Sequence, residues 1–225
     1  MSESYTLIVS GRSSELTANY FPPIELSPHK HYALALVELQ TFNAIPNIDE
    51  GRNKLYIEGE EPIVFPTGSY EIEDIHHYAV KKVKDLIIKP NNNTLRSELK
   101  CSKPIDFRPS DSIGPLLGFT PRLLPPNRLH ESDLPVAILK INALRVECNI
   151  TGGAYINERR AHTIHNFFPS VPPGYKILEV PPNPIYLPVT VTSIHHLQLR
   201  IVDQDGHLIN FRGEEITVRL HIKSI

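Results

Sequence analysis

The sequence predicts an all-β protein with one inserted α-helix and long proline-rich loops, and three observations support this prediction. The last quarter of the chain, Ser193 to Ile225, consists of short strand patterns in immediate succession. The chain contains 21 prolines against 11 glycines. Because proline cannot donate a hydrogen bond to a central strand, this density favours loops and strand ends. Clear helical periodicity occurs in one segment, residues 71–86.

Strand patterns begin close to the N-terminus. Thr6–Val9 is a short apolar run that ends at Ser10-Gly11. Residues 32–42 start almost entirely apolar and then alternate, which indicates a central strand covered on both faces at one end. Two further short strands are expected over residues 54–58 and 95–101.

The helix is expected over residues 71–86, where apolar side chains recur at spacings of three and four. Acidic residues stand at its start and lysines near its end, an order that complements the helix dipole. We expect the helix to fill a crossover between strands and to pack on the sandwich through Ile72, Ile75, Ala79 and Val83. Its solvent-exposed face would carry Lys81, Lys82 and Lys84.

Residues 136–150 form the longest strand candidate, and the apolar phase slips within it. Odd positions are apolar up to Ile141, and even positions are apolar from Leu144 onward. A slip of one residue moves the apolar set to the other face of a strand. We therefore expect a bulge or a sharp bend near Asn142 and Ala143.

The C-terminal segment shows the most regular alternation. Apolar residues occupy every second position in two consecutive runs, and Asp205-Gly206 supplies a turn between them. Such a pattern is typical of strands with one face on a core and one in water. The predicted core residues of these runs are Leu197, Leu199, Ile201, Ile216, Val218, Leu220 and Ile222.

Composition limits the function classes. With 225 residues, 40% of them hydrophobic, the chain predicts a globular protein, which we interpret as one domain over residues 1–225. The net charge of −2 and the lack of a basic run argue against binding nucleic acid through its phosphates. No signal peptide and no membrane span are expected. Cys101 and Cys148 are predicted to be buried thiols.

Catalytic and metal-binding patterns are weak. No nucleophile elbow and no glycine-rich phosphate loop occur. His162-x-x-His165 lacks a third ligand, and Asp203-x-Asp205-Gly206 fits a hairpin turn better than a calcium loop. We therefore predict no enzyme activity, no cofactor and no metal site.

Residues 151–175 appear as a long irregular loop, and loops of this length are uncommon unless they have a function. This stretch combines arginines, aromatic rings and prolines, the residue types that are enriched at interfaces or that stiffen a loop. A simpler alternative is that Phe167 and Phe168 anchor the loop on their own domain. The candidate subunit-interface residues are Arg159, Arg160, Phe167, Phe168 and Tyr175.

Several short sequence motifs, spread over nearly the whole chain, together resemble one family. Each motif has residue types typical of turns and strands rather than of a catalytic site. They are Phe21-Pro-Pro-Ile24, Ile45-Pro-Asn-Ile-Asp49, Pro66-Thr-Gly-Ser-Tyr-Glu-Ile-Glu-Asp-Ile75, Leu116-Leu-Gly-Phe119, Glu147-Cys-Asn-Ile150, Phe168-Pro-Ser-Val-Pro-Pro-Gly-Tyr175 and Gly213-Glu-Glu-Ile-Thr-Val218. In this order they resemble the penton, or minor capsid, proteins of Polinton/Maverick elements and the related adintoviruses.

The resemblance implies a single jelly roll, an architecture that the short strands, the one helix and the proline-rich loops also fit. It further implies a homopentamer at the vertices of an icosahedral particle, beside a double-jelly-roll major capsid protein. Localisation in the virion capsid, synthesis in the cytoplasm and assembly in the host nucleus follow from it as expectations. A tower or insertion domain, known in some pentons, has no evident counterpart in the sequence.

A second hypothesis assigns the chain to a different class of protein, a cellular β-sandwich binding module that recognises a sugar or a peptide. A module of that kind would present a concave cluster of aromatic and polar side chains on a monomer. A capsid subunit would instead associate with its own copies through broad lateral faces.

Overall fold

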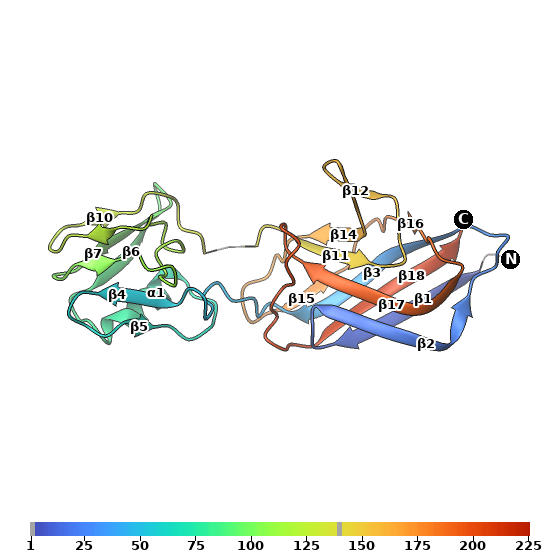
Figure 1. Cartoon of the computed structure of the whole chain (residues 1–225), viewed down its shortest axis with the longest axis horizontal. Coiled ribbons are helices and arrows are strands. Elements are labelled where there is room, and N and C mark those ends of the chain that lie inside the picture. Colours follow the sequence, from blue (N-terminus) through green and yellow to red (C-terminus); the bar gives the residue numbers. More distant parts are fainter. Residues whose placement is uncertain (1–2, 139–140) are drawn as a thin grey trace. The chain divides into compact units, whose positions relative to one another are not determined.

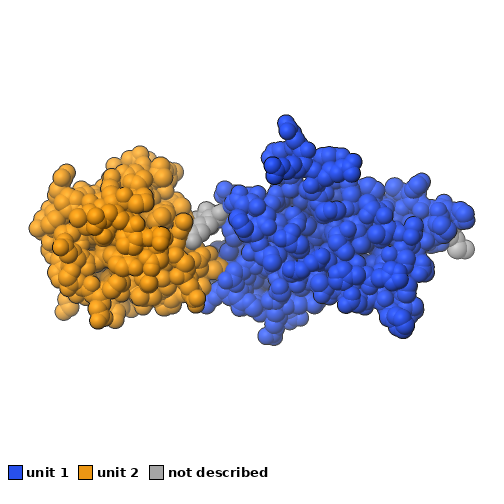
Figure 2. All heavy atoms as spheres, viewed as in Figure 1, with its two compact units in different colours: residues 1–45, 141–225 blue, residues 46–140 orange. Residues whose placement is uncertain are grey.

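A computed structural model describes residues 3–138 and 141–225 of the chain. The chain forms two compact units, one made of residues 1–45 and 141–225 and the other of residues 46–140 (Figure 2). The sequence analysis expected one domain over residues 1–225, and the structure differs because residues 46–140 enclose a hydrophobic core of their own. No glycine- or serine-rich linker marks either junction in the sequence, so composition gave no sign of the division.

The first unit is a sandwich of two antiparallel sheets (Figure 1). The first sheet contains, in spatial order, β1 (Ser4–Gly11), β18 (Ile216–Ser224), β3 (Tyr32–Phe42) and β15 (Lys176–Glu179), with β16 (Leu187–Pro188) also paired to β3. The second sheet contains β14 (Thr163–Phe167), β11 (Leu144–Cys148), β17 (Ser193–Val202) and β2 (Glu15–Glu25). A small hairpin, β12 (Ala154–Ile156) and β13 (Arg159–Ala161), connects β11 to β14.

The strand order identifies a jelly roll. Counted along the chain, the main strands β1, β2, β3, β11, β14, β15, β17 and β18 are the first to the eighth. One sheet then has the order first, eighth, third, sixth, and the other has the order second, seventh, fourth, fifth. Two interleaved four-stranded sheets of this kind form a jelly roll. The predicted all-β jelly-roll fold is confirmed.

The predicted C-terminal core is also confirmed. All seven residues named from the alternation are fully buried between the two sheets. The predicted double coverage of one strand end is confirmed in β3, where the five residues from Tyr32 to Leu36 are all buried. Tyr186 lies over this end of the sheet: its hydroxyl is 2.8 Å from Nδ1 of His221, the residue paired with Ala35.

The second unit contains one helix, α1 (Ile72–Val80), among its described residues, and two small sheets. Its core contains buried aromatic rings, of which Phe107 and Phe119 stack with ring centroids 4.9 Å apart. One sheet contains β10 (His130–Glu131), β7 (Arg96–Lys100) and β6 (Ile87–Asn91), and the other contains β5 (Ile63–Val64), β4 (Lys54–Ile57), β8 (Ile105–Asp106) and β9 (Leu123–Leu124).

The helix prediction requires two corrections. The helix ends at Val80 rather than near Leu86, because the chain continues in tight turns, in which Leu86 N–H donates to the Val83 carbonyl over 3.2 Å. Val83 and Leu86 stay buried in these turns, which produced the helix-like spacing. The helix packs in the core of the second unit and not on the sandwich. The three lysines after it are exposed, as predicted.

The long strand predicted over residues 136–150 is not one strand. Val136 and Ile138 pack against the core of the second unit, whereas Leu144, Val146 and Cys148 belong to β11 and the core of the sandwich. Residues 139 and 140 of this prediction lie outside the described residues. The chain therefore passes from one core to the other within these residues, and the strand that was expected to carry a bulge or a sharp bend near Asn142 and Ala143 is not formed over residues 136–150.

Within residues 3–138 and 141–225, no helix has the length and apolar character needed to cross a membrane.

The second unit is expected to fold by itself, because no residue of the sandwich takes part in its core. A fragment of residues 46–140 should unfold cooperatively when followed by circular dichroism. Phe107→Ala in that fragment should lower its stability by about 3–5 kcal/mol, since the ring is fully buried. A fragment that melts without a transition would contradict the independence of this core.

Candidate assembly surface

Residues 151–175, expected to form an irregular loop, contain three strands. They are β12, β13 and β14, and the longest irregular stretch that remains covers residues 168–175. The sequence did not indicate these strands because β12 and β13 are only three residues long, too short to show alternation. β14 is an edge strand, so its burial pattern is incomplete.

The β12–β13 hairpin is closed by a two-residue turn, Asn157-Glu158. Asn157 has a φ of 52°, a left-handed conformation that asparagine tolerates and that tight hairpin turns require. Tyr155 lies opposite Arg160 in the hairpin register, and both side chains are exposed. Ile156 lies opposite Arg159, and the pair lines a groove below the hairpin.

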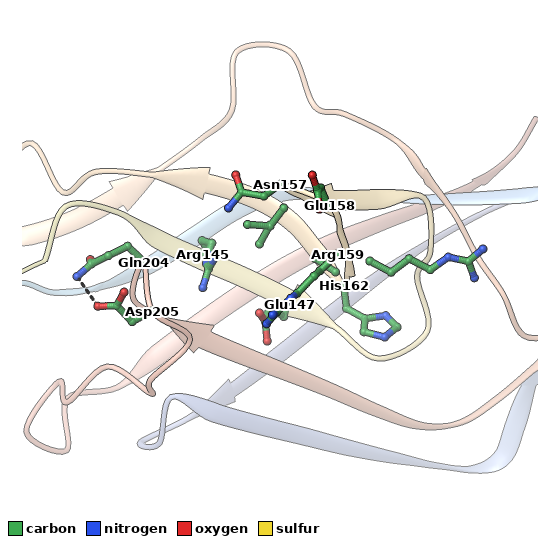
Figure 3. A pocket seen from close by; sticks show the side chains of 11 residues that line it. Arg145, Glu147, Asn157, Glu158, Arg159, His162, Gln204 and Asp205 are labelled. Carbon is green, nitrogen blue, oxygen red and sulfur yellow. Dashed lines mark hydrogen bonds between the residues drawn. The ribbon is translucent and has the colours of Figure 1, made fainter.

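Figure 3 shows this groove between the hairpin and strand β11. Its volume is about 630 Å³. Arg145 and Glu147 extend from β11, and Gln204 and Asp205 border it from the turn after β17 (Figure 3). Arg159 and Arg160 both line it, so the structure brings these two predicted residues together.

The charges around this groove balance one another. Three arginines face three carboxylates, those of Glu147, Glu158 and Asp205. Glu147 is already paired with Arg200, with Nη1 and Oε2 2.9 Å apart. The groove therefore has no strong preference for an anion, and no phenylalanine or tyrosine lines it among the described residues.

Phe167, at the end of β14, packs against the sandwich core and stacks on His165 with centroids 5.8 Å apart. His165 Nε2 lies 2.8 Å from Oε1 of Glu179 on β15. This contact joins the two sheets along one side of the sandwich, because β14 and β15 are edge strands of different sheets. Phe167 is therefore an anchor for its own domain, whereas Phe168 is exposed.

The segment between β14 and β15 is held by Asn43, a residue that the sequence analysis did not select. Its side-chain amide donates to the Val171 carbonyl over 2.8 Å. Its backbone donates to the Tyr175 carbonyl and accepts from Gly174 N–H, both over 2.8 Å. The exposed Tyr175 ring is thus presented by a fixed backbone. The available signal in the sequence was an asparagine directly after the apolar run of residues 32–42.

The five predicted residues therefore fall into two groups on the same side of the sandwich. Arg159 and Arg160 belong to the hairpin that connects β11 to β14. Phe167, Phe168 and Tyr175 belong to the connection between β14 and β15. Because β14 and β15 are the edge strands on this side, the two groups form what we call the hairpin side of the sandwich.

The histidine and aspartate candidates of the sequence make contacts with the backbone. Ligand atoms of Asp203, Asp205 and His207 lie within 4.8 Å of one another. However, Oδ1 of Asp203 accepts the backbone N–H groups of Asp205 and His207, at 2.8 and 2.9 Å, which is the pattern of a tight turn. His162 contacts the Thr151 carbonyl at 2.8 Å, so it has a different partner from His165.

Both cysteines are free and buried. Burial raises the pKa of the Cys148 thiol to about 11, and it also raises that of Cys101. Fewer thiolates are then present at pH 8 in the folded chain than in the unfolded one, since an unperturbed cysteine has a pKa of about 8.5. We expect a thiol reagent at pH 8 to label the native protein at least about a hundredfold more slowly than the urea-unfolded protein. Equal rates would contradict the buried placement.

Comparison with known proteins agrees with the jelly-roll fold. No family model matches the sequence, and no curated protein matches it. The structure is similar to the crystal structure of the selenomethionine-labelled penton protein of mavirus, with a TM-score of 0.55 and 13% sequence identity. The similarity covers 99% of this chain and 100% of the mavirus chain. The resemblance to penton proteins is thus supported at the level of the fold.

Proposed function

We propose that this protein is a structural capsid subunit, a penton or minor capsid protein. The observation that carries the proposal is the similarity to the mavirus penton protein over essentially the full length of both chains. A match confined to the sandwich would fit any jelly-roll protein, but this one extends through the inserted unit as well.

In this proposal five copies form a ring at each vertex of an icosahedral particle, beside a double-jelly-roll major capsid protein. The exposed rings and guanidinium groups of the hairpin side support a contact between copies, since such residues are frequent at the centres of interfaces. The protein then has a structural rather than a catalytic role and is part of the virion capsid. The Polinton/Maverick or adintovirus lineage, synthesis in the cytoplasm and assembly in the nucleus belong to the same proposal.

The alternative, a sandwich module that binds a sugar or a peptide, has less support. The groove under the hairpin is wide, polar and balanced in charge. A second groove in the inserted unit, about 570 Å³ in volume, is lined by Ile72, Leu95 and Val136 among others and includes no phenylalanine, tyrosine or tryptophan. Neither of these described grooves offers the aromatic platform that sugar or peptide recognition often uses.

The mass of the protein in solution tests the proposal. Sedimentation velocity over a range of concentrations should show a monomer when dilute and a single larger species of five chains when concentrated. A species that stays monomeric at high concentration, and that does not enter particles formed by the major capsid protein, would reject the capsid proposal. The binding-module alternative would then take its place.

A further inference from the structure

A fully exposed phenylalanine projects from the edge of the sandwich opposite to the hairpin side. Between two paired stretches of β2 and β17, the four residues from Tyr20 to Pro23 oppose the single residue His195, so β2 bulges outward. Tyr20 packs on the core and anchors this bulge. The exposed fraction of Phe21 is 101%, the highest value among the exposed large hydrophobic residues that the structure describes.

This exposure has no structural purpose within a monomer. A phenylalanine in water gains nothing from the fold, and an edge strand with an apolar side chain invites contact with another chain. Two prolines follow Phe21 and restrict its backbone. Fixing the ring in a contact therefore costs less conformational entropy than it would in a flexible loop.

The hairpin side offers a matching surface at the same end of the sheet. The side-chain amide of Asn149, just after β11, donates to the carbonyl of His196 over 3.2 Å. The β2 bulge lies opposite His195, so the connection from β11 to the hairpin begins at the same height along the strands as the bulge. The bulge and β14 nevertheless lie on opposite edges of the sheet. Figure 1 shows the hairpin and β2 on opposite sides of the sandwich.

We infer that Phe21 of one copy packs on the exposed Tyr155–Arg160 face of the hairpin of the next copy. Arginine and tyrosine directly opposite each other form a platform for an aromatic ring, through a cation–π contact and through ring packing. Glu25, exposed at the end of β2, adds a negative charge beside the bulge, and this charge suits a contact with the exposed Arg160 of the platform. The partner is therefore a second copy of this chain.

The geometry of this contact is head to tail. The donor surface is the β2 edge and the acceptor surface is the hairpin side, so each copy uses one of each. Such a heterologous contact closes into a ring when the rotation between copies is correct. The inference rests on the proposed function and names the two surfaces that meet in the ring.

Pairs of cysteine variants test the inference directly. Phe21→Cys chains are mixed with Tyr155→Cys chains at ring-forming concentration and oxidised with copper phenanthroline. The two positions cannot be bridged within one chain, because three strand spacings of about 4.8 Å separate the edges of the sheet and a disulfide spans under about 7 Å between Cα atoms. We expect a disulfide-linked dimer in the mixture. Neither variant alone should give one, and neither should Phe21→Cys mixed with Leu208→Cys, an exposed position at the other end of β17.

Ring formation by Phe21→Ser completes the test. This variant should need a protein concentration at least about tenfold higher to form rings, as expected for the loss of an interface hot spot, whereas Leu208→Ser should match the natural chain. If the natural chain forms rings but Phe21→Ser forms them equally well and no mixed disulfide appears, the inference is overturned and the proposed function stands. If the natural chain forms no ring at any concentration, the inference is overturned. The proposed function is overturned as well if the chain also does not enter particles formed by the major capsid protein.

Discussion

Val218→Asp is expected to abolish soluble expression of the protein. Val218 is fully buried in β18, and its neighbours in the core are apolar. An ionised carboxylate without a partner costs several kcal/mol at such a site, and it exists there only after its pKa has risen strongly. Since a domain is stable by about 5–15 kcal/mol in total, one such group removes most of that margin.

Thr217→Asp is the matched control, because Thr217 lies one residue away on the opposite, solvent-facing side of the same strand. Its hydroxyl is 2.9 Å from that of Ser10, an exposed contact whose loss has a small effect. The yield of folded protein and the thermal melting point provide the measurement. A Val218→Asp protein that melts like the natural one would contradict the placement of this strand in the jelly-roll core.

The simultaneous change of Arg159, Arg160 and Phe168 to serine is expected to leave the fold intact and to abolish rings in electron micrographs. All three side chains are exposed on the hairpin side, so the sandwich core is not disturbed. Loss of two arginines and one aromatic ring removes the residue types that contribute most to interface affinity. Thermal melting establishes that the variant is folded, and negative-stain images establish whether rings remain.

A control variant with the same chemical change elsewhere is Lys81→Ser, Arg128→Ser and Leu129→Ser. It also removes two positive charges and one exposed apolar side chain, but from the inserted unit. Rings that persist in the hairpin-side variant would exclude this surface from the contact between copies. Rings lost in both variants would attribute the effect to a general change in charge or solubility.

The regular strands could be predicted because each has one buried face and one solvent-exposed face. Period-two alternation in β17 and β18 identified their core residues correctly, and the all-apolar start of β3 identified the strand end that is covered on both faces. The helix was found, but its end was misplaced. Val83 and Leu86 lie in turns after the helix, but they are buried and continue its spacing of apolar residues. This spacing alone does not distinguish such turns from a longer helix.

The two-unit organisation could not be predicted, for a physical reason. Residues 136–150 show no shift in composition that marks a boundary between units. Their change of apolar phase near residue 142 is equally consistent with a bulge and with passage into another core. Only the contacts of Val136 and Leu144 distinguish the two cases. The sequence analysis also did not select Phe21 as a contact residue, since exposure is not visible in a motif and neighbouring prolines do not reveal on which side of a bulge a ring lies.

The symmetry of the assembled protein is the most direct test of the central claim, that this jelly roll is a ring-forming capsid subunit. Electron microscopy of the concentrated protein, averaged without imposed symmetry, provides the measurement. We expect closed five-fold rings in which the β2 edge of each copy meets the hairpin side of the next. Two-fold dimers, open filaments or monomers under all conditions would contradict the account.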